Sequence, residues 1–185
     1  MITSRLRVNF AAMRTALRTL IRICLLAAKP QDLPASRELL VGCIAAAFTV
    51  QFVGYNMLTE DGNPFLLAAT NTAMMGVIWV MLLQFSRHMD RWHQSACAIY
   101  GSMAIINLVS LPVIAWSIDL TGMEAGGLRD SARLIVIGLW AWEIAVSARI
   151  IRETLEIRMP LAVAMGIALS FALQIVMVFL FGPAR

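Results

Sequence analysis

Residues 95–118, SACAIYGSMAIINLVSLPVIAWSI, form a run of 24 residues that contains no Asp, Glu, Lys or Arg. An α-helix rises 1.5 Å per residue, so about 20 apolar residues cross the roughly 30 Å hydrocarbon core of a bilayer. This run is therefore long enough to span a membrane as one helix. Three further charge-free runs are also long enough: residues 39–58, 65–85 and 159–181.

The overall composition favours the same class of protein. Of the 185 residues, 60% are hydrophobic and 14% are charged, whereas a soluble domain has roughly 45–50% apolar and about 25% charged residues. A soluble globule, a disordered chain, a collagen-like fibre and a disulfide scaffold are all disfavoured. The length suits one compact all-α membrane bundle rather than two domains.

A fifth span is predicted at residues 131–151, although Arg133 and Arg149 enclose only 15 residues, one of which is Glu143. It crosses the membrane only if the helix extends to about Ser131 and Ile151, with both arginines reaching toward the headgroups. With five spans and the N-terminus inside, 12 Lys and Arg residues lie inside and three outside; without this span the tally is 10 against 5. The positive-inside rule therefore predicts five transmembrane helices, with a cytosolic N-terminus and an external C-terminus.

Residues 1–37 are predicted to be a separate element that precedes the bundle of residues 38–185. No acidic residue occurs between Arg5 and Lys29, and arginines and apolar residues recur there at helical spacing. The basic positions are Arg7, Arg14, Arg18 and Arg22, and the apolar positions are Leu6, Phe10, Met13, Leu17, Ile21 and Cys24. This pattern predicts a basic amphipathic helix that lies in the membrane interface, with its arginines toward anionic headgroups. Pro30 and Pro34 then break the helix and direct the chain into the first span.

Two other interpretations of this segment stay open. An Arg-rich segment without acidic residues is also typical of a mitochondrial presequence, which would imply the mitochondrial inner membrane. A cytosolic helix that docks on a partner protein would use the same face. A secretory signal is disfavoured because arginines interrupt the apolar run.

Five polar residues fall inside the predicted spans: Gln51, Asn71, Asn107, Glu143 and Gln174. From the helical rise, the four amides lie at a similar height of roughly 18–21 Å from the inner ends of their helices, and Glu143 at roughly 12 Å. Amides at a common level bond across helices and hold a bundle in register. The alternative is a polar pocket or path in which Glu143 is an ion or proton site. In either case we expect Glu143 to be protonated, to face the bundle, or to pair with Arg149 or with an amide on a neighbouring helix.

Small residues in the last span predict a close helix contact, within the chain or with a partner chain. Ala162, Gly166 and Ser170 recur every four residues, and this spacing lets helix backbones approach closely in lipid.

No catalytic or metal-binding pattern is found. The sequence lacks the GxSxG, HExxH, GxxxxGK[ST] and GxGxxG motifs and has no pair of acids within a span. The only histidines, His88 and His93, are five residues apart in a basic connection, which does not match a metal pair on a helix. We therefore expect no enzyme, no cofactor and no metal site.

The run Lys29-Pro30-Gln31-Asp32-Leu33-Pro34-Ala35-Ser36-Arg37, followed directly by five spans, resembles small bacterial membrane proteins of the Yip1-domain type. The resemblance implies a five-helix membrane protein with a cytosolic N-terminus, whose eukaryotic relatives act in membrane trafficking through protein contacts. It implies no catalytic or ligand-binding residues. The basic N-terminal helix differs from the longer, acidic or polar tails of those relatives.

The sequence thus predicts a non-enzymatic protein of a bacterial inner membrane, either a scaffold or an accessory subunit. Its expected partners are anionic lipid headgroups and a protein partner or a second copy of the chain, and not nucleic acid. The alternative prediction is a small transporter or proton-coupled permease that uses Glu143 and the amide layer.

Overall fold

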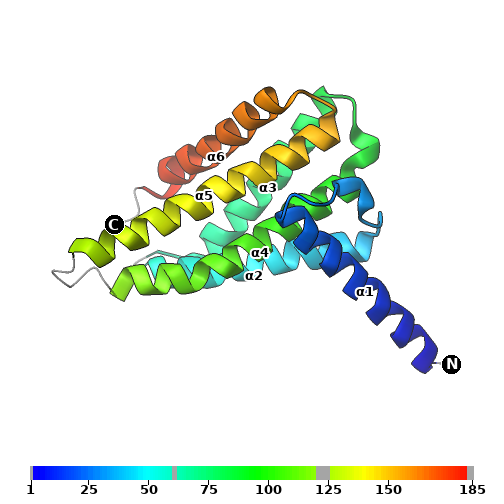
Figure 1. The fold of residues 1–185 in the computed structure, drawn as a ribbon, viewed down its shortest axis with the longest axis horizontal. Coiled ribbons are helices and arrows are strands. Elements are labelled where there is room, and N and C mark those ends of the chain that lie inside the picture. The colour runs from blue at the N-terminus through cyan, green and yellow to red at the C-terminus, as the bar shows by residue number, and fades with distance from the viewer. Residues whose placement is uncertain (1, 60–61, 120–125, 183–185) are drawn as a thin grey trace.

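The computed structural model describes residues 2–59, 62–119 and 126–182, and the side chains of residues 13–59, 62–118 and 130–182. Every regular element in these ranges is a helix (Figure 1). The order is α1 (Ile2–Cys24), η1 (Pro30–Asp32), α2 (Arg37–Leu58), α3 (Pro64–Phe85), η2 (Met89–Arg91), α4 (Trp92–Asp119), α5 (Gly126–Leu155) and α6 (Met159–Phe181).

Within the described residues, five helices are long and apolar enough to cross a membrane, which confirms this part of the prediction. They are α2 to α6, and they include the five predicted spans. The fifth prediction depended on a helix that continues past both arginines. α5 does so at each end, since it runs from Gly126 to Leu155.

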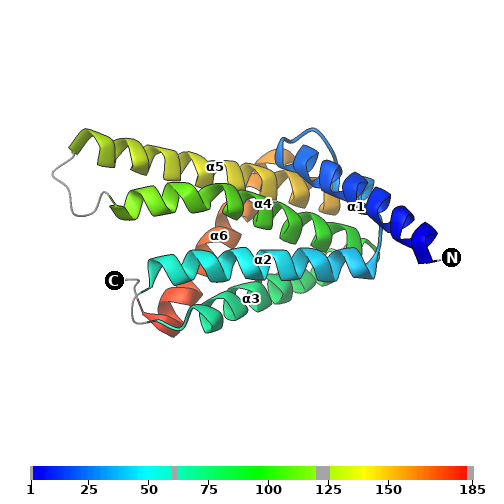
Figure 2. The same ribbon diagram turned by 90° about the horizontal axis from the view of Figure 1, so that it is seen from below.

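α4 lies at the centre of the bundle and contacts α1, α2, α3 and α5. Its ten consecutive residues from Ser95 to Ala104 are all buried. Small side chains such as Ala96, Gly101 and Ser102 let neighbouring helices approach this segment closely. α2 and α3 pack together on one side of α4 and α5 packs on the other, while α6 packs on α5 and also contacts α3 (Figures 1 and 2).

Local signals explain where the helices begin and end. The side chains of Ser36 and Asn63 accept hydrogen bonds from the first turns of α2 and α3, which satisfies backbone donors that have no partner inside the helix. One or two residues after the ends of α1, α3 and α5, Leu26, Arg87 and Glu156 have positive φ angles of 59°, 59° and 56°. Glycine usually occupies such a left-handed position, so these three ends carry backbone strain.

α1 lies obliquely across α4 and α5 at the end of the bundle where α2 begins. Its N-terminal part extends beyond the bundle, while its C-terminal part packs on α4 (Figures 1 and 2). α6 ends at the opposite end of the bundle (Figure 1).

Candidate functional site

The C-terminal half of α1 is docked on the bundle. Ala16, Leu20, Ile23 and Cys24 are 0–5% exposed, and they recur at the spacing of one helix face. Leu20 lies against Gly101 of α4, so closely that a Cβ at Gly101 would come within 2.6 Å of Leu20 Cδ2. The absence of a side chain at Gly101 therefore allows α1 to approach α4.

Polar contacts hold the tip of α1 in this position. The indole Nε1 of Trp142 on α5 donates to the Cys24 carbonyl at 2.8 Å, and the Cys24 thiol lies 4.0 Å from the Ser102 carbonyl on α4. Burial raises the pKa of the Cys24 thiol to about 11. Ser102 lies seven residues after Ser95, where the charge-free run of α4 begins, and Trp142 lies seven residues before Arg149 on α5; each distance is about 10 Å along its helix. The C-terminal end of α1 thus contacts α4 and α5 about two helical turns in from the ends of their apolar segments.

The rest of the described apolar side of α1, which the sequence pattern placed on one face, is exposed. Met13, Leu17 and Ile21 are 58%, 52% and 43% exposed, although the sequence pattern placed them on one face with the buried Cys24. The exposed Arg14, Arg18 and Arg22 lie on the adjoining face. The side chains of Arg7, Leu6 and Phe10 are outside the described residues. We call the exposed stripe and the three arginines the outer face of α1; it combines apolar and cationic groups, as an interfacial helix does.

The Pro-flanked run after α1 is packed against the bundle. Pro30 and Leu33 are buried, and Gln31 Nε2 donates to the Glu153 carbonyl at 2.6 Å. The Glu153 carboxylate, 14% exposed, lies 3.4 Å from Lys29 Nζ and 3.4 Å from Arg149 Nε. Sequence reasoning missed this cluster, because Lys29 and Glu153 are far apart in the chain.

A small polar cavity of about 90 Å³ lies among α2, α3, α5 and α6, and Met103 of α4 also lines it. Three predicted residues line it, namely Asn71, Glu143 and Gln174. Tyr55 also lines it, and its hydroxyl accepts a hydrogen bond from Asn71 Nδ2 at 2.8 Å. The remaining polar lining residues are Ser147 and Ser170. A cavity of this size and polarity has room for water molecules.

Tyr55 and Ser147 are cavity residues that the sequence analysis did not identify. Ser147 follows Glu143 by four residues and so shares its face of α5, a signal that was present in the sequence. Tyr55 gave no such signal, because only the fold brings it to Asn71.

The other two predicted amides lie outside this cavity. Gln51 is 6% exposed, and its Nε2 lies 3.6 Å from the sulfur of Met103, a residue that lines the cavity. Asn107 is half-buried one turn farther along α4 and is not part of the lining. The structure therefore brings three of the five predicted residues together.

Glu143 forms no ion pair with any described residue, whereas Arg149 pairs with Glu153. The side-chain oxygen Oδ1 of Asn71, in the same cavity, is buried and accepts no hydrogen bond from the described residues. The cavity thus holds a carboxyl group without an ion pair and a buried amide oxygen that helix packing alone does not satisfy.

The small-residue row of α6 faces α5 within the same chain. Ala162 is fully buried, and a Cβ at Gly166 would lie 3.5 Å from the backbone of Ile144 and Ala148. Ser170 donates to the Gly166 carbonyl at 3.0 Å and lines the polar cavity. The close contact of α6 with α5 therefore forms one wall of that cavity.

Five helices of this length and polarity define the chain as an integral membrane protein. Comparisons with models of protein families, with curated proteins and with solved structures found no match to it.

Proposed function

We propose that the protein is a non-enzymatic scaffold or accessory subunit of a bacterial inner membrane, in contact with anionic lipid through the outer face of α1. The observation that supports this proposal is that only part of the apolar side of α1 is buried. One half fixes α1 to α4, and the other half, with three arginines beside it, is exposed. A surface helix needs such a face to enter the boundary between headgroups and acyl chains, to a depth of about 5–10 Å.

The distribution of charge supports a cytosolic location for α1. The described basic side chains gather at the α1 end of the bundle: Lys29, Arg37, Arg87, Arg91, Arg149, Arg152 and Arg158. At the other end, the described basic side chain is Arg133, which lies 3.7 Å from Asp130. By the positive-inside rule, the α1 end faces the cytosol. A C-terminal reporter that is active only in the cytosol would overturn this topology.

An environment-sensitive fluorophore at Leu17→Cys tests the lipid contact in reconstituted protein. Emission is expected to shift to the blue in vesicles that contain phosphatidylglycerol, compared with phosphatidylcholine alone. Replacing Arg14, Arg18 and Arg22 by Gln should abolish the difference, since each arginine contributes about 1 kcal/mol near an anionic surface. Arg152→Gln, which removes an exposed positive charge from α5, is the control.

A pull-down in mild detergent tests the scaffold role. We expect a reproducible, stoichiometric partner whose recovery falls when α1 loses its arginines. A protein without a partner and without a lipid response at Leu17 would overturn the proposal.

The polar cavity favours a second candidate function, a small transporter or proton-coupled permease. Glu143 lies there with Asn71 and Gln174 from two other helices, and an ionisable group at membrane depth commonly marks an ion or proton path. Glu143→Gln is then expected to abolish a measurable flux in vesicles while the protein still inserts. If Glu143→Gln and Asn71→Leu change only thermal stability in detergent, this candidate is excluded.

A further inference from the structure

A second, much larger cavity lies between α2 and α3 on the flank of the bundle away from α5. It is a groove of about 780 Å³, with α4 as its floor. The walls carry small residues, including Ala45 on α2 and Ala73 and Gly76 on α3. The exposed side chains of Val41 and Val77, each 59% exposed, border it, so the groove is open to the surrounding lipid.

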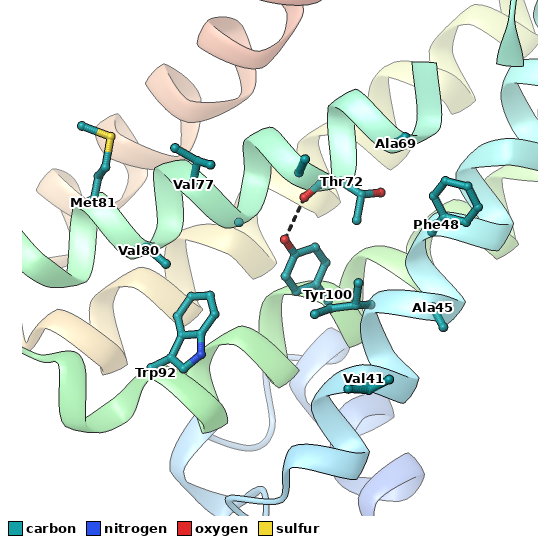
Figure 3. Close-up of a pocket in the computed structure, with 13 residues that line it drawn as sticks. Val41, Ala45, Phe48, Ala69, Thr72, Val77, Val80, Met81, Trp92 and Tyr100 are labelled. Carbon is teal, nitrogen blue, oxygen red and sulfur yellow. Dashed lines mark hydrogen bonds between the residues drawn. The ribbon is translucent and has the colours of Figure 1, made fainter. Parts of the chain in front are cut away.

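The floor of the groove is apolar because its main polar group is already bonded. The Tyr100 hydroxyl donates to the Thr72 carbonyl at 2.8 Å (Figure 3). Gly76 allows this arrangement, since a Cβ there would lie 2.7 Å from the same hydroxyl. An occupant of the groove therefore meets mainly hydrocarbon.

The groove extends through only one leaflet. Trp92 and Met81 lie at its α1 end, and Phe48 and Ala69 at the other end (Figure 3). Beyond that end the rings of Phe48 and Phe65 meet edge to face at 5.4 Å and join α2 to α3. From Ala69 to Met81 the groove covers about 18 Å of α3. This length matches half of a roughly 30 Å hydrocarbon core and is too short for a spanning partner helix.

The mouth of the groove carries groups that suit an anionic headgroup. Arg37, which is exposed, lies four residues before Val41 and so one turn below it on the same face of α2. On α3, Gln84 follows Val80 by four residues and so lies one turn beyond it on the same face, toward the α1 end. The Trp92 indole N–H makes no hydrogen bond to a described residue, and an interfacial tryptophan donates to lipid headgroups.

We propose that this groove binds one acyl chain of an anionic diacyl phospholipid from the leaflet at the α1 end, with the phosphate between Arg37 and Trp92. The groove gives the chain no hydrophobic advantage over bulk lipid, because acyl chains are equally apolar. Selectivity therefore comes from the headgroup. One arginine near a phosphate is expected to favour phosphatidylglycerol over phosphatidylcholine about fivefold. This site is separate from the outer face of α1.

Native mass spectrometry of the intact protein, extracted by mild detergent from vesicles of equal phosphatidylglycerol and phosphatidylcholine, tests the proposal. The wild type is expected to retain one phospholipid with the fivefold preference. Ala45→Phe fills the groove and should reduce retention at least about tenfold, whereas Ala46→Phe, on the exposed neighbouring position outside the lining, should retain lipid as the wild type does. Arg37→Gln should keep the lipid and lose the preference.

Each other result counts against the proposal. It is overturned if Ala45→Phe and Ala46→Phe retain lipid equally, if the wild type retains none, if Arg37→Gln keeps the preference, or if the retained species is a second copy of the chain. Ala73→Phe fills the groove from α3 and replaces Ala45→Phe if that variant does not fold. The variant that lacks Arg14, Arg18 and Arg22 should still retain the groove lipid, which distinguishes this site from α1.

Discussion

The contact of α1 with α4 gives the sharpest prediction, because one methyl group should disturb it. In Gly101→Ala, the new Cβ would lie 2.6 Å and 2.9 Å from the two Cδ atoms of Leu20 and 3.3 Å from Cys43 Sγ. Leu20 is 5% exposed and has little space to move. Overpacking of this kind costs about 1–3 kcal/mol. We expect that cost to fall on the docking of α1 and not on the insertion of the five spans.

Alkylation of the native Cys24 measures this docking. Its thiol is 2% exposed in the docked helix, and its pKa is raised from 9.0 to about 11, so docked Cys24 is nearly unreactive at neutral pH. Only molecules with α1 released react. A loss of 1–3 kcal/mol raises their population, and hence the alkylation rate, about 5- to 150-fold. Peptide mapping by mass spectrometry distinguishes Cys24 from the buried Cys43 and Cys97.

Two variants decide whether the methyl group acts as described. Gly138→Ala is the matched control, because nothing lies within 4 Å of a Cβ at Gly138; its rate should equal that of the wild type. Leu20→Ala removes both crowded Cδ atoms, so adding Gly101→Ala to it should cause little further increase. Equal rates for Gly101→Ala and Gly138→Ala, or fully additive effects in the double variant, would refute the reasoning.

Three further predictions concern the α1 end of the bundle. Trp142→Phe removes the hydrogen bond to the Cys24 carbonyl and should weaken docking by about 0.5–1.5 kcal/mol, seen as faster Cys24 alkylation; an unchanged rate would contradict this. Arg87→Gly relieves a φ of 59° and should stabilise the protein by about 1 kcal/mol in thermal unfolding, whereas Arg87→Ala should give no gain. The hydrogen bond and charge of Arg91 lower the pKa of Glu156 below 4.5, so the stability from this pair is present above pH 4.5 and is lost as pH falls through the lowered value. Melting curves of Glu156→Gln should lack this acid-dependent loss.

The spans could be predicted from the sequence because length and polarity are local properties. Residues 159–181 became α6 with the predicted bounds, and residues 39–58 became α2 except for its first two residues. Even the interrupted span around Glu143 was predicted, because the arginines at its ends are tolerated near headgroups. Lipid leaves the chain few alternatives, since every backbone group in the hydrocarbon must be bonded within a helix.

The docked face of α1 could not be predicted in the same way. Met13, Leu17 and Ile21 are as apolar as the residues that pack, so periodicity alone does not decide between the two halves of the apolar side. The choice depends on Gly101, about 80 residues later in the chain, where the missing side chain accommodates Leu20. Long-range shape complementarity of this kind leaves no local pattern.

The polar cavity was predicted only in part, for a geometric reason. The helical rise gives a height along each helix but not the level at which neighbouring helices begin. Gln51 contacts Met103 and not Asn107, so the charge-free parts of α2 and α4 are offset by about one turn. Asn71, Glu143 and Gln174 nevertheless line one cavity, although the helical rise placed Glu143 lower than the amides.

Trp142 and Glu143 are adjacent in α5 but contact different parts of the protein, so substituting each one tests a different candidate function. Trp142 bonds the end of α1, whereas Glu143 lines the polar cavity. A lipid-bound scaffold needs a docked α1 and tolerates a neutral residue at 143, so Trp142→Phe should impair partner recovery while Glu143→Gln does not. In a transporter the path needs the carboxyl group of Glu143 whether or not α1 is fully docked, so Glu143→Gln should abolish flux while Trp142→Phe does not. Partner recovery and vesicle flux should therefore be measured for both variants. Loss of partner recovery in Trp142→Phe alone indicates the scaffold, and loss of flux in Glu143→Gln alone indicates the transporter.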